Sequence, residues 1–165
     1  MLERTNLLLD VDSYKISHHR QYPAGTTHVS SYIESRGGAF AETVFFGLQA
    51  WIKKNLLKPL TREEIEEWIE VSTAHGLMPN TEGALRILNQ HGGFLPIQID
   101  AAPEGNIISV KNVLAQVVNT DPMLPWLTSY METSLLRSIW YPTTVATLSR
   151  EAKKRIYAGL LQTSD

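Results

Sequence analysis

The sequence contains no cysteine among its 165 residues. It therefore offers neither a disulfide framework nor a thiolate zinc site, and a reducing compartment is the simplest expectation. It has no apolar run long enough to span a membrane. Its first twenty residues carry acids and paired histidines in place of the apolar centre of a signal peptide. These absences predict a soluble, cytoplasmic chain without a membrane partner.

A surplus of basic charge is also missing, because 15 Lys and Arg residues face 17 Asp and Glu residues, for a net charge of -2. This balance argues against nucleic acid as a partner, which would require a basic surface. The chain lacks the Walker loop, the dinucleotide-binding glycine fingerprint, HExxH and GxSxG. The glycine pairs in RGG and HGG have no flanking lysine of the kind that a phosphate-binding loop carries, and they predict turns. Local motifs therefore assign no reaction.

What the sequence does contain is the composition of a globular domain, with 43% hydrophobic residues. Residues 28–36 alternate and predict a strand that places Tyr32 and Arg36 on its polar face. A second strand is predicted over residues 97–101. A third, more apolar strand is predicted over 112–120, and its composition suits a sheet covered on both faces.

Apolar spacing and capping patterns predict helices over residues 42–57, 61–70, 82–90, 121–140 and 143–162. Because strands and helices do not alternate regularly, the predicted class is α+β, a small, mostly antiparallel sheet with flanking helices. We place an N-terminal α+β domain over residues 1–122 and a helical segment over residues 123–165.

The opening segment reads LLLDVDSYKISHHRQYP and concentrates polar side chains that can contact a ligand. Because tyrosines mostly pack, composition alone favours a packing role for Tyr14 over contact with a ligand. Arg36 follows a strand beside a glycine pair, where an anion can bind, although a surface ion pair with Glu34 or a neighbouring acid is the better supported interpretation from the residues alone. His18 and His19 point to different sides of any regular element. With no closed set of ligands, no metal site is predicted.

Longer segments of the chain, taken together, resemble a single family. They read DSYKISHHRQYP, SYIESR, ETVFFGLQAWI, GGFLPIQIDAAPEGNII, NVLAQVVNTDP and WLTSYMETSLLRSIWYPTTVATLSREAKK. In this order they resemble nicotinamide phosphoribosyltransferases over nearly the whole chain, with residues 58–90 least distinctive. The resemblance implies the N-terminal domain of a type II phosphoribosyltransferase whose α/β barrel is missing.

The resemblance also implies a reaction and a set of substrate-binding residues. Members of the family convert nicotinamide and phosphoribosyl pyrophosphate to nicotinamide mononucleotide and pyrophosphate in NAD salvage, as homodimers with active sites at the subunit boundary. By this resemblance Tyr14 stacks on the nicotinamide ring of the partner subunit's site, and Arg36 holds phosphate. Asp12 and Lys15 flank Tyr14 and position it. Mg²⁺ accompanies phosphoribosyl pyrophosphate and ATP, without a complete binding site for either in this chain.

Family members are far longer, and the resemblance places the barrel beyond Asp165. No catalytic residue is therefore expected in this chain, which is expected to be inactive alone and to need a homodimer or a complementing C-terminal half. Two alternatives stay open, namely a non-enzymatic module that pairs with a full-length homologue, and a fragment of a nicotinate phosphoribosyltransferase. Without the barrel, exposure is predicted for the apolar residues Leu127, Met131, Leu135, Ile156 and Leu160.

Overall fold

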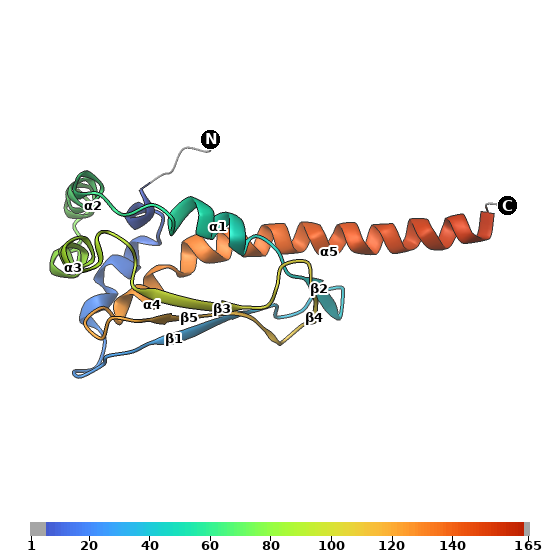
Figure 1. The fold of residues 1–165 in the computed structure, drawn as a ribbon, viewed down its shortest axis with the longest axis horizontal. Helices are drawn as coiled ribbons and strands as arrows, with labels where there is room; N and C mark the ends of the chain where they lie inside the picture. The colour runs from blue at the N-terminus through green and yellow to red at the C-terminus, as the bar shows by residue number, and fades with distance from the viewer. Residues whose placement is uncertain (1–5, 164–165) are drawn as a thin grey trace.

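The computed structural model describes residues 6–163, in which helices cover one face of a small sheet (Figure 1). The strands are β1 (Ser30–Glu34), β2 (Glu42–Val44), β3 (Ile97–Ala101), β4 (Ile107–Ser109) and β5 (Val113–Asn119). The α-helices are α1 (Leu48–Asn55), α2 (Arg62–Ala74), α3 (Thr81–His91), α4 (Trp126–Tyr130) and α5 (Glu132–Thr163). The opening segment forms the 3-10 helices η1 (Leu7–Leu9) and η2 (Ser13–Arg20). The predicted α+β class is confirmed.

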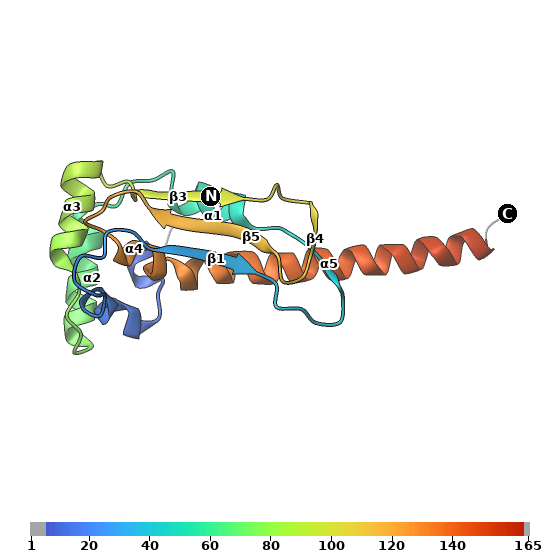
Figure 2. The ribbon, with the colours of Figure 1, turned by 90° about the horizontal axis from the view of Figure 1, so that it is seen from below.

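The main sheet has three antiparallel strands in the order β1-β5-β3, and β2 pairs with β4 in a separate two-stranded sheet. Helices α4 and α5 lie on one face of the main sheet, and the view from below shows the opposite face uncovered (Figures 1 and 2). On that open face Gln116 of β5 is exposed and donates to the hydroxyl of Ser30 at 2.8 Å. The prediction that the third strand is covered on both faces is therefore wrong.

An aromatic cluster closes the core at the end of the sheet where α2 lies. Trp68 and Trp126 meet the ring of Tyr130 edge-on, with centroids 6.3 and 5.1 Å away. The Tyr130 hydroxyl donates to the Leu8 carbonyl at 2.7 Å and accepts from Trp68 Nε1 at 2.9 Å. Burial raises the pKa of Tyr130, which keeps this hydroxyl protonated as a donor. The cluster therefore joins η1, α2 and α4.

This core takes residues from both sides of residue 122. The boundary predicted at residue 122 stays a prediction. Residues 1 and 165, the outer ends of the two predicted segments, lie outside the described residues.

The helix predicted over residues 42–57 is wrong in its first third. Residues 42–44 form β2, paired with β4, and α1 begins only at Leu48. Gly47, at the N-terminal cap of α1, has a φ of 109°, which separates the strand from the helix. The apolar spacing that suggested one helix includes Phe45. This residue lies in the loop between β2 and α1, and its side chain is fully buried in the core.

The prediction of a helix over 121–140 and another after Pro142 is also wrong. Helix α4 begins at Trp126, and α5 continues through Pro142 without a break. A proline in a helix removes the N–H that would bond the carbonyl four residues earlier, here that of Ser138. That carbonyl faces Gly47, where an added Cβ would lie 2.0 Å from the Ser138 oxygen. Because Gly47, the residue before α1, has no side chain, the Ser138 carbonyl has room beside it and α5 can continue through Pro142.

The exposure predicted for the last helices is confirmed for the end of α5 only. Ile156 and Leu160 are more than half exposed on the part of α5 that extends beyond the body of the domain (Figure 1). By contrast, Leu127, Met131 and Leu135 are buried in the domain's own core. Although α5 is long, no helix within residues 6–163 combines the length and apolar character needed to cross a membrane.

A polar cluster at the end of β5 joins it to α3. The carboxylate of Asp121 accepts from Arg86 Nε at 2.6 Å, from His91 Nε2 at 2.8 Å and from the Met123 N–H at 2.9 Å. Asn119 donates to the Asp121 carbonyl at 2.8 Å. The hydrogen bond from Arg86, followed by those from His91 and Met123, holds the pKa of Asp121 well below its usual range despite the opposing effect of burial.

We expect Asp121 to make the domain sensitive to acid. A carboxyl whose pKa is lower in the folded chain contributes stability above its unfolded pKa of about 4, and this contribution is lost as the pH falls further. Asp121→Asn should lower the free energy of unfolding at pH 7 by about 1.5–3 kcal/mol, the range for a hydrogen bond to a charged group. Urea unfolding of both proteins at pH 7 and pH 3 measures this. An equal loss of stability between these pH values in both proteins would contradict the assignment.

Candidate functional site

The opening segment is attached to the start of α5 by charged side chains. Lys15 is buried, and its ammonium group pairs with the Glu132 carboxylate and donates to the Ser129 carbonyl at 3.3 Å. Five residues further along the helix than Glu132, Arg137 pairs with Asp10. These contacts join residues more than a hundred positions apart, and they hold η2 against α4 and α5.

Between the two charged contacts lies the pair formed by Asp12 and Tyr14. The Tyr14 hydroxyl donates to Asp12 Oδ2 at 3.2 Å, and the same oxygen accepts from the Thr133 hydroxyl at 2.7 Å. Tyr14 as a whole is 56% exposed. Its nearest aromatic neighbour is His18, at 5.2 Å between centroids and tilted by 46°. Tyr14 is therefore held by its hydroxyl while much of its ring is left open to a ligand.

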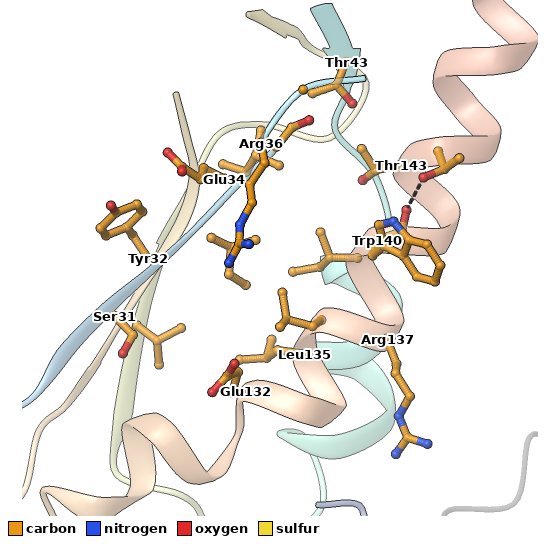
Figure 3. Close-up of a pocket in the computed structure, with 18 of the residues that line it drawn as sticks. Ser31, Tyr32, Glu34, Arg36, Thr43, Glu132, Leu135, Arg137, Trp140 and Thr143 are labelled. Atoms are coloured by element: carbon orange, nitrogen blue, oxygen red, sulfur yellow. Dashed lines mark hydrogen bonds between the residues drawn. The ribbon is translucent and has the colours of Figure 1, made fainter. Parts of the chain in front are cut away.

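A second feature is a cleft of about 920 Å³ between β1 and the first half of α5. Its floor is apolar, with Leu135 and Ile139 among its residues, and Trp140 stands at its edge with 69% of its surface exposed. In Figure 3 the Arg36 side chain points from the end of β1 toward α5, whereas Tyr32 points away from the helix. The prediction that these two residues share one face is wrong.

The change of face has a local cause. The register between β1 and β5 shifts at a bulge between Ile33 and Glu34, and β1 ends there, so the alternation does not continue to Arg36. Within residues 6–163 Arg36 forms no ion pair with Glu34, the alternative that the sequence left open. The exposed guanidinium thus keeps its donors available for an anion.

Helix α5 connects the two features. Glu132 and Arg137 line the cleft, and the same two residues hold Lys15 and Asp10 of the opening segment. The structure therefore joins Asp12 directly to Tyr14, whereas Arg36 lines the cleft with Glu132 and Arg137. Sequence reasoning missed the α5 residues, because nothing in the local pattern of an amphipathic helix indicates which of its polar side chains meets a segment so distant in the chain.

The histidines do not form a metal site. Among residues 6–163, no three side chains of His, Cys, Asp or Glu lie close enough together to hold a metal ion. His91 binds Asp121, as described above. His19 is half-buried with Nδ1 3.0 Å from the Ile16 carbonyl, and burial lowers its pKa. Both residues therefore have structural partners.

Comparison with known proteins relates this chain to one family. Residues 6–99 match the model of the "Nicotinamide phosphoribosyltransferase, N-terminal domain". Proteins named nicotinamide phosphoribosyltransferase are similar to nearly the whole chain. The protein from Xanthomonas campestris is 46% identical over 160 residues, 97% of this chain and 34% of the relative. The protein from Acinetobacter baylyi is 33% identical over 175 residues, 92% of this chain and 33% of the relative. This chain therefore spans about a third of the length of these relatives.

A solved structure supports the fold. The crystal structure of human nicotinic acid phosphoribosyltransferase superposes with a TM-score of 0.58 over 82% of this chain and 26% of the human chain, at 21% sequence identity. At this identity the likeness shows the fold alone, in agreement with the predicted N-terminal domain of a type II phosphoribosyltransferase.

Proposed function

Because the chain belongs to the nicotinamide phosphoribosyltransferase family through its N-terminal domain, we propose that it forms part of a cytoplasmic enzyme of NAD salvage. The reaction joins the ring nitrogen of nicotinamide to the anomeric carbon of phosphoribosyl pyrophosphate. The bond from that carbon to pyrophosphate breaks, and pyrophosphate leaves with the electron pair. The match of residues 6–99, which include Tyr14 and Arg36, is the observation that carries this proposal.

In this proposal Tyr14 supplies a stacking surface for nicotinamide in the site of a partner subunit. A flat, weakly polar ring needs a rigid aromatic surface to hold its nitrogen in line with the leaving group. The exposed ring and tethered hydroxyl of Tyr14 support this role. Asp12 contributes by accepting that hydroxyl rather than by touching the reacting atoms.

Arg36 is proposed to bind the phosphate groups of phosphoribosyl pyrophosphate. Departing pyrophosphate is strongly anionic, and a guanidinium presents paired donors to two of its oxygens. The position of Arg36 over the cleft, without an ion pair within residues 6–163, supports this role.

Mg²⁺ and ATP belong to the proposal only through the family. Magnesium commonly binds through substrate phosphates with few protein carboxylates. Since the described residues form no cluster able to hold a metal, we assign none of them to Mg²⁺ or to ATP.

A chimaeric enzyme tests the proposed function. In it, this chain replaces the matching third of the Xanthomonas campestris relative, with which it shares 46% identity. We expect the chimaera to produce nicotinamide mononucleotide and pyrophosphate from nicotinamide and phosphoribosyl pyrophosphate. This chain by itself should not. Arg36→Ala should raise the KM for phosphoribosyl pyrophosphate about ten- to a hundredfold, as one charge-assisted hydrogen bond contributes about 1.5–3 kcal/mol. A folded chimaera with no turnover would contradict the proposal.

The same chimaera addresses the two alternatives. Nicotinate used in preference to nicotinamide would favour the nicotinate reading. The non-enzymatic reading draws on the exposed apolar side chains Ile156, Tyr157, Leu160 and Leu161 at the end of α5. It is favoured if the unmodified chain co-purifies with a full-length homologue and changes that enzyme's rate, while the chimaera remains inactive.

A further inference from the structure

Asp12 stands at a helix cap but does not act as one. It precedes η2, where an aspartate normally accepts the first free backbone N–H groups of the helix. Its side chain makes no such bond. Instead, Oδ2 accepts both the Tyr14 hydroxyl and the Thr133 hydroxyl. The carboxylate is therefore diverted from capping to a contact between the opening segment and α5.

Thr133 differs from three other threonines of α5, whereas Thr143 likewise binds outside the helix and donates to the Phe46 carbonyl at 3.0 Å. Thr144, Thr147 and Thr163 each donate to the carbonyl four residues earlier in their own helix, at 2.7–2.9 Å. The half-buried Thr133 hydroxyl instead donates to Asp12 and also accepts from the Asp12 backbone N–H at 3.4 Å. One hydroxyl thus contacts Asp12 at two points, on its side chain and on its backbone.

From these contacts we infer that Thr133 is a positioning residue for Tyr14. The inference deepens the proposed function, because any effect of Thr133 on catalysis rests on the proposed role of Tyr14. Thr133 fixes the Asp12 carboxylate on the first turn of α5, and that carboxylate holds the Tyr14 hydroxyl. The orientation of the exposed ring is thus set by the helix that also lines the Arg36 cleft. Of the residues in this chain of contacts, only Tyr14 would touch nicotinamide.

The orientation of the ring can be measured without any activity. Tyrosine labelled with ¹³C at the ring ε positions gives a separate NMR signal for each of the six tyrosines, and Tyr14→Phe identifies that of Tyr14. Thr133→Val should shift the Tyr14 signal toward that of free tyrosine and weaken its cross-relaxation with His18, whose ring centroid is 5.2 Å away. Thr133→Ser, which keeps the hydroxyl, should restore both.

Thr144→Val is the matched control, because it removes a hydroxyl from the same helix that donates within the helix. It should leave the Tyr14 signal unchanged. Asp12→Ala removes the acceptor on the other side of the contact and should displace the Tyr14 ring in the same way as Thr133→Val. It therefore tests the contact even if Thr133→Val folds poorly. A Tyr14 signal that is unchanged in Asp12→Ala and in folded Thr133→Val would overturn the inference.

Kinetics of the chimaera separate this inference from the proposed function. Thr133→Val should raise the KM for nicotinamide about two- to tenfold, the effect of one hydrogen bond, with little change in kcat. Thr133→Ser should restore the KM. If Tyr14→Ala leaves nicotinamide use intact while Thr133→Val displaces the Tyr14 signal, the assignment of Tyr14 to nicotinamide fails and the positioning contact stands. If Tyr14→Ala impairs nicotinamide use but Thr133→Val moves neither the signal nor the KM, the positioning inference fails.

Discussion

Gly47→Ala is expected to destabilise the domain by about 2–5 kcal/mol, enough to leave a marginally stable domain largely unfolded. The cap of α1 has a φ of 109°, in which an L-residue with a side chain is strained. The new Cβ would also lie 2.0 Å from the Ser138 carbonyl oxygen and 3.1 Å from Pro142 Cγ. Since the nearest atom belongs to the backbone of α5, relief requires α1 and α5 to separate. Urea unfolding followed by circular dichroism measures the effect.

Gly37→Ala is the matched control for this prediction. Gly37 has a φ of 112°, close to that of Gly47, but an added Cβ would meet nothing within 4 Å. Its substitution therefore introduces the backbone strain without the clash and should cost about 1–2 kcal/mol. The difference between the two variants isolates the contact between Gly47 and α5. Equal effects would show that this contact contributes nothing.

Tyr14→Ala in the chimaera is expected to lower kcat/KM for nicotinamide about ten- to a hundredfold. Stacking of a heteroaromatic base on an aromatic side chain contributes about 1–3 kcal/mol, which corresponds to this range. The KM for phosphoribosyl pyrophosphate should change little, because that substrate is assigned to Arg36. Steady-state kinetics with each substrate varied in turn distinguish the two effects.

Tyr14→Phe keeps the ring and removes only the hydroxyl that Asp12 accepts at 3.2 Å. It should lower kcat/KM by two- to tenfold, similar to Thr133→Val, since both release the ring without deleting it. Because Tyr14 is more than half exposed in the chain, neither Tyr14→Ala nor Tyr14→Phe should change the urea midpoint appreciably. Full activity in the alanine variant would refute stacking by Tyr14. A drop in stability matching the drop in activity would instead indicate a structural role.

Local patterns predicted those elements whose ends are set by neighbouring residues. The Thr61–Glu64 capping box is formed in both directions, and α2 begins immediately after Thr61. The alternation of β1 and the short strand β3 were also predicted from their own residues. The contacts of the capping box lie within three residues, which is why a sequence pattern carries them. The strands pair with the more distant β5, but their alternation of side chains is itself visible in the sequence.

Other predictions failed where a distant residue decided the outcome. Pro142 would normally end a helix, but Gly47 offers room for the Ser138 carbonyl, and the Thr143 hydroxyl accepts the Phe46 N–H at 3.1 Å. The residues around Phe45 had helical spacing, yet the pairing of β2 with β4 holds Glu42–Val44 in a strand. Such contacts leave no trace in local spacing.

For the candidate site, too, some features follow from the sequence and others only from the tertiary structure. The sequence by itself determined the α+β class, because the pattern of residue types is sufficient for it. Through the order of its longer segments it also determined the family, whose resemblance implies the substrate-binding candidates Tyr14, Asp12 and Arg36. Only the tertiary structure showed that Asp12 holds Tyr14 rather than capping η2. Only the structure, too, turned Arg36 toward α5 and brought Thr133 to Asp12. Hydrogen bonds and ion pairs depend on distances between side chains, and for residues 121 positions apart those distances are set by the packing of α5 against the rest of the fold.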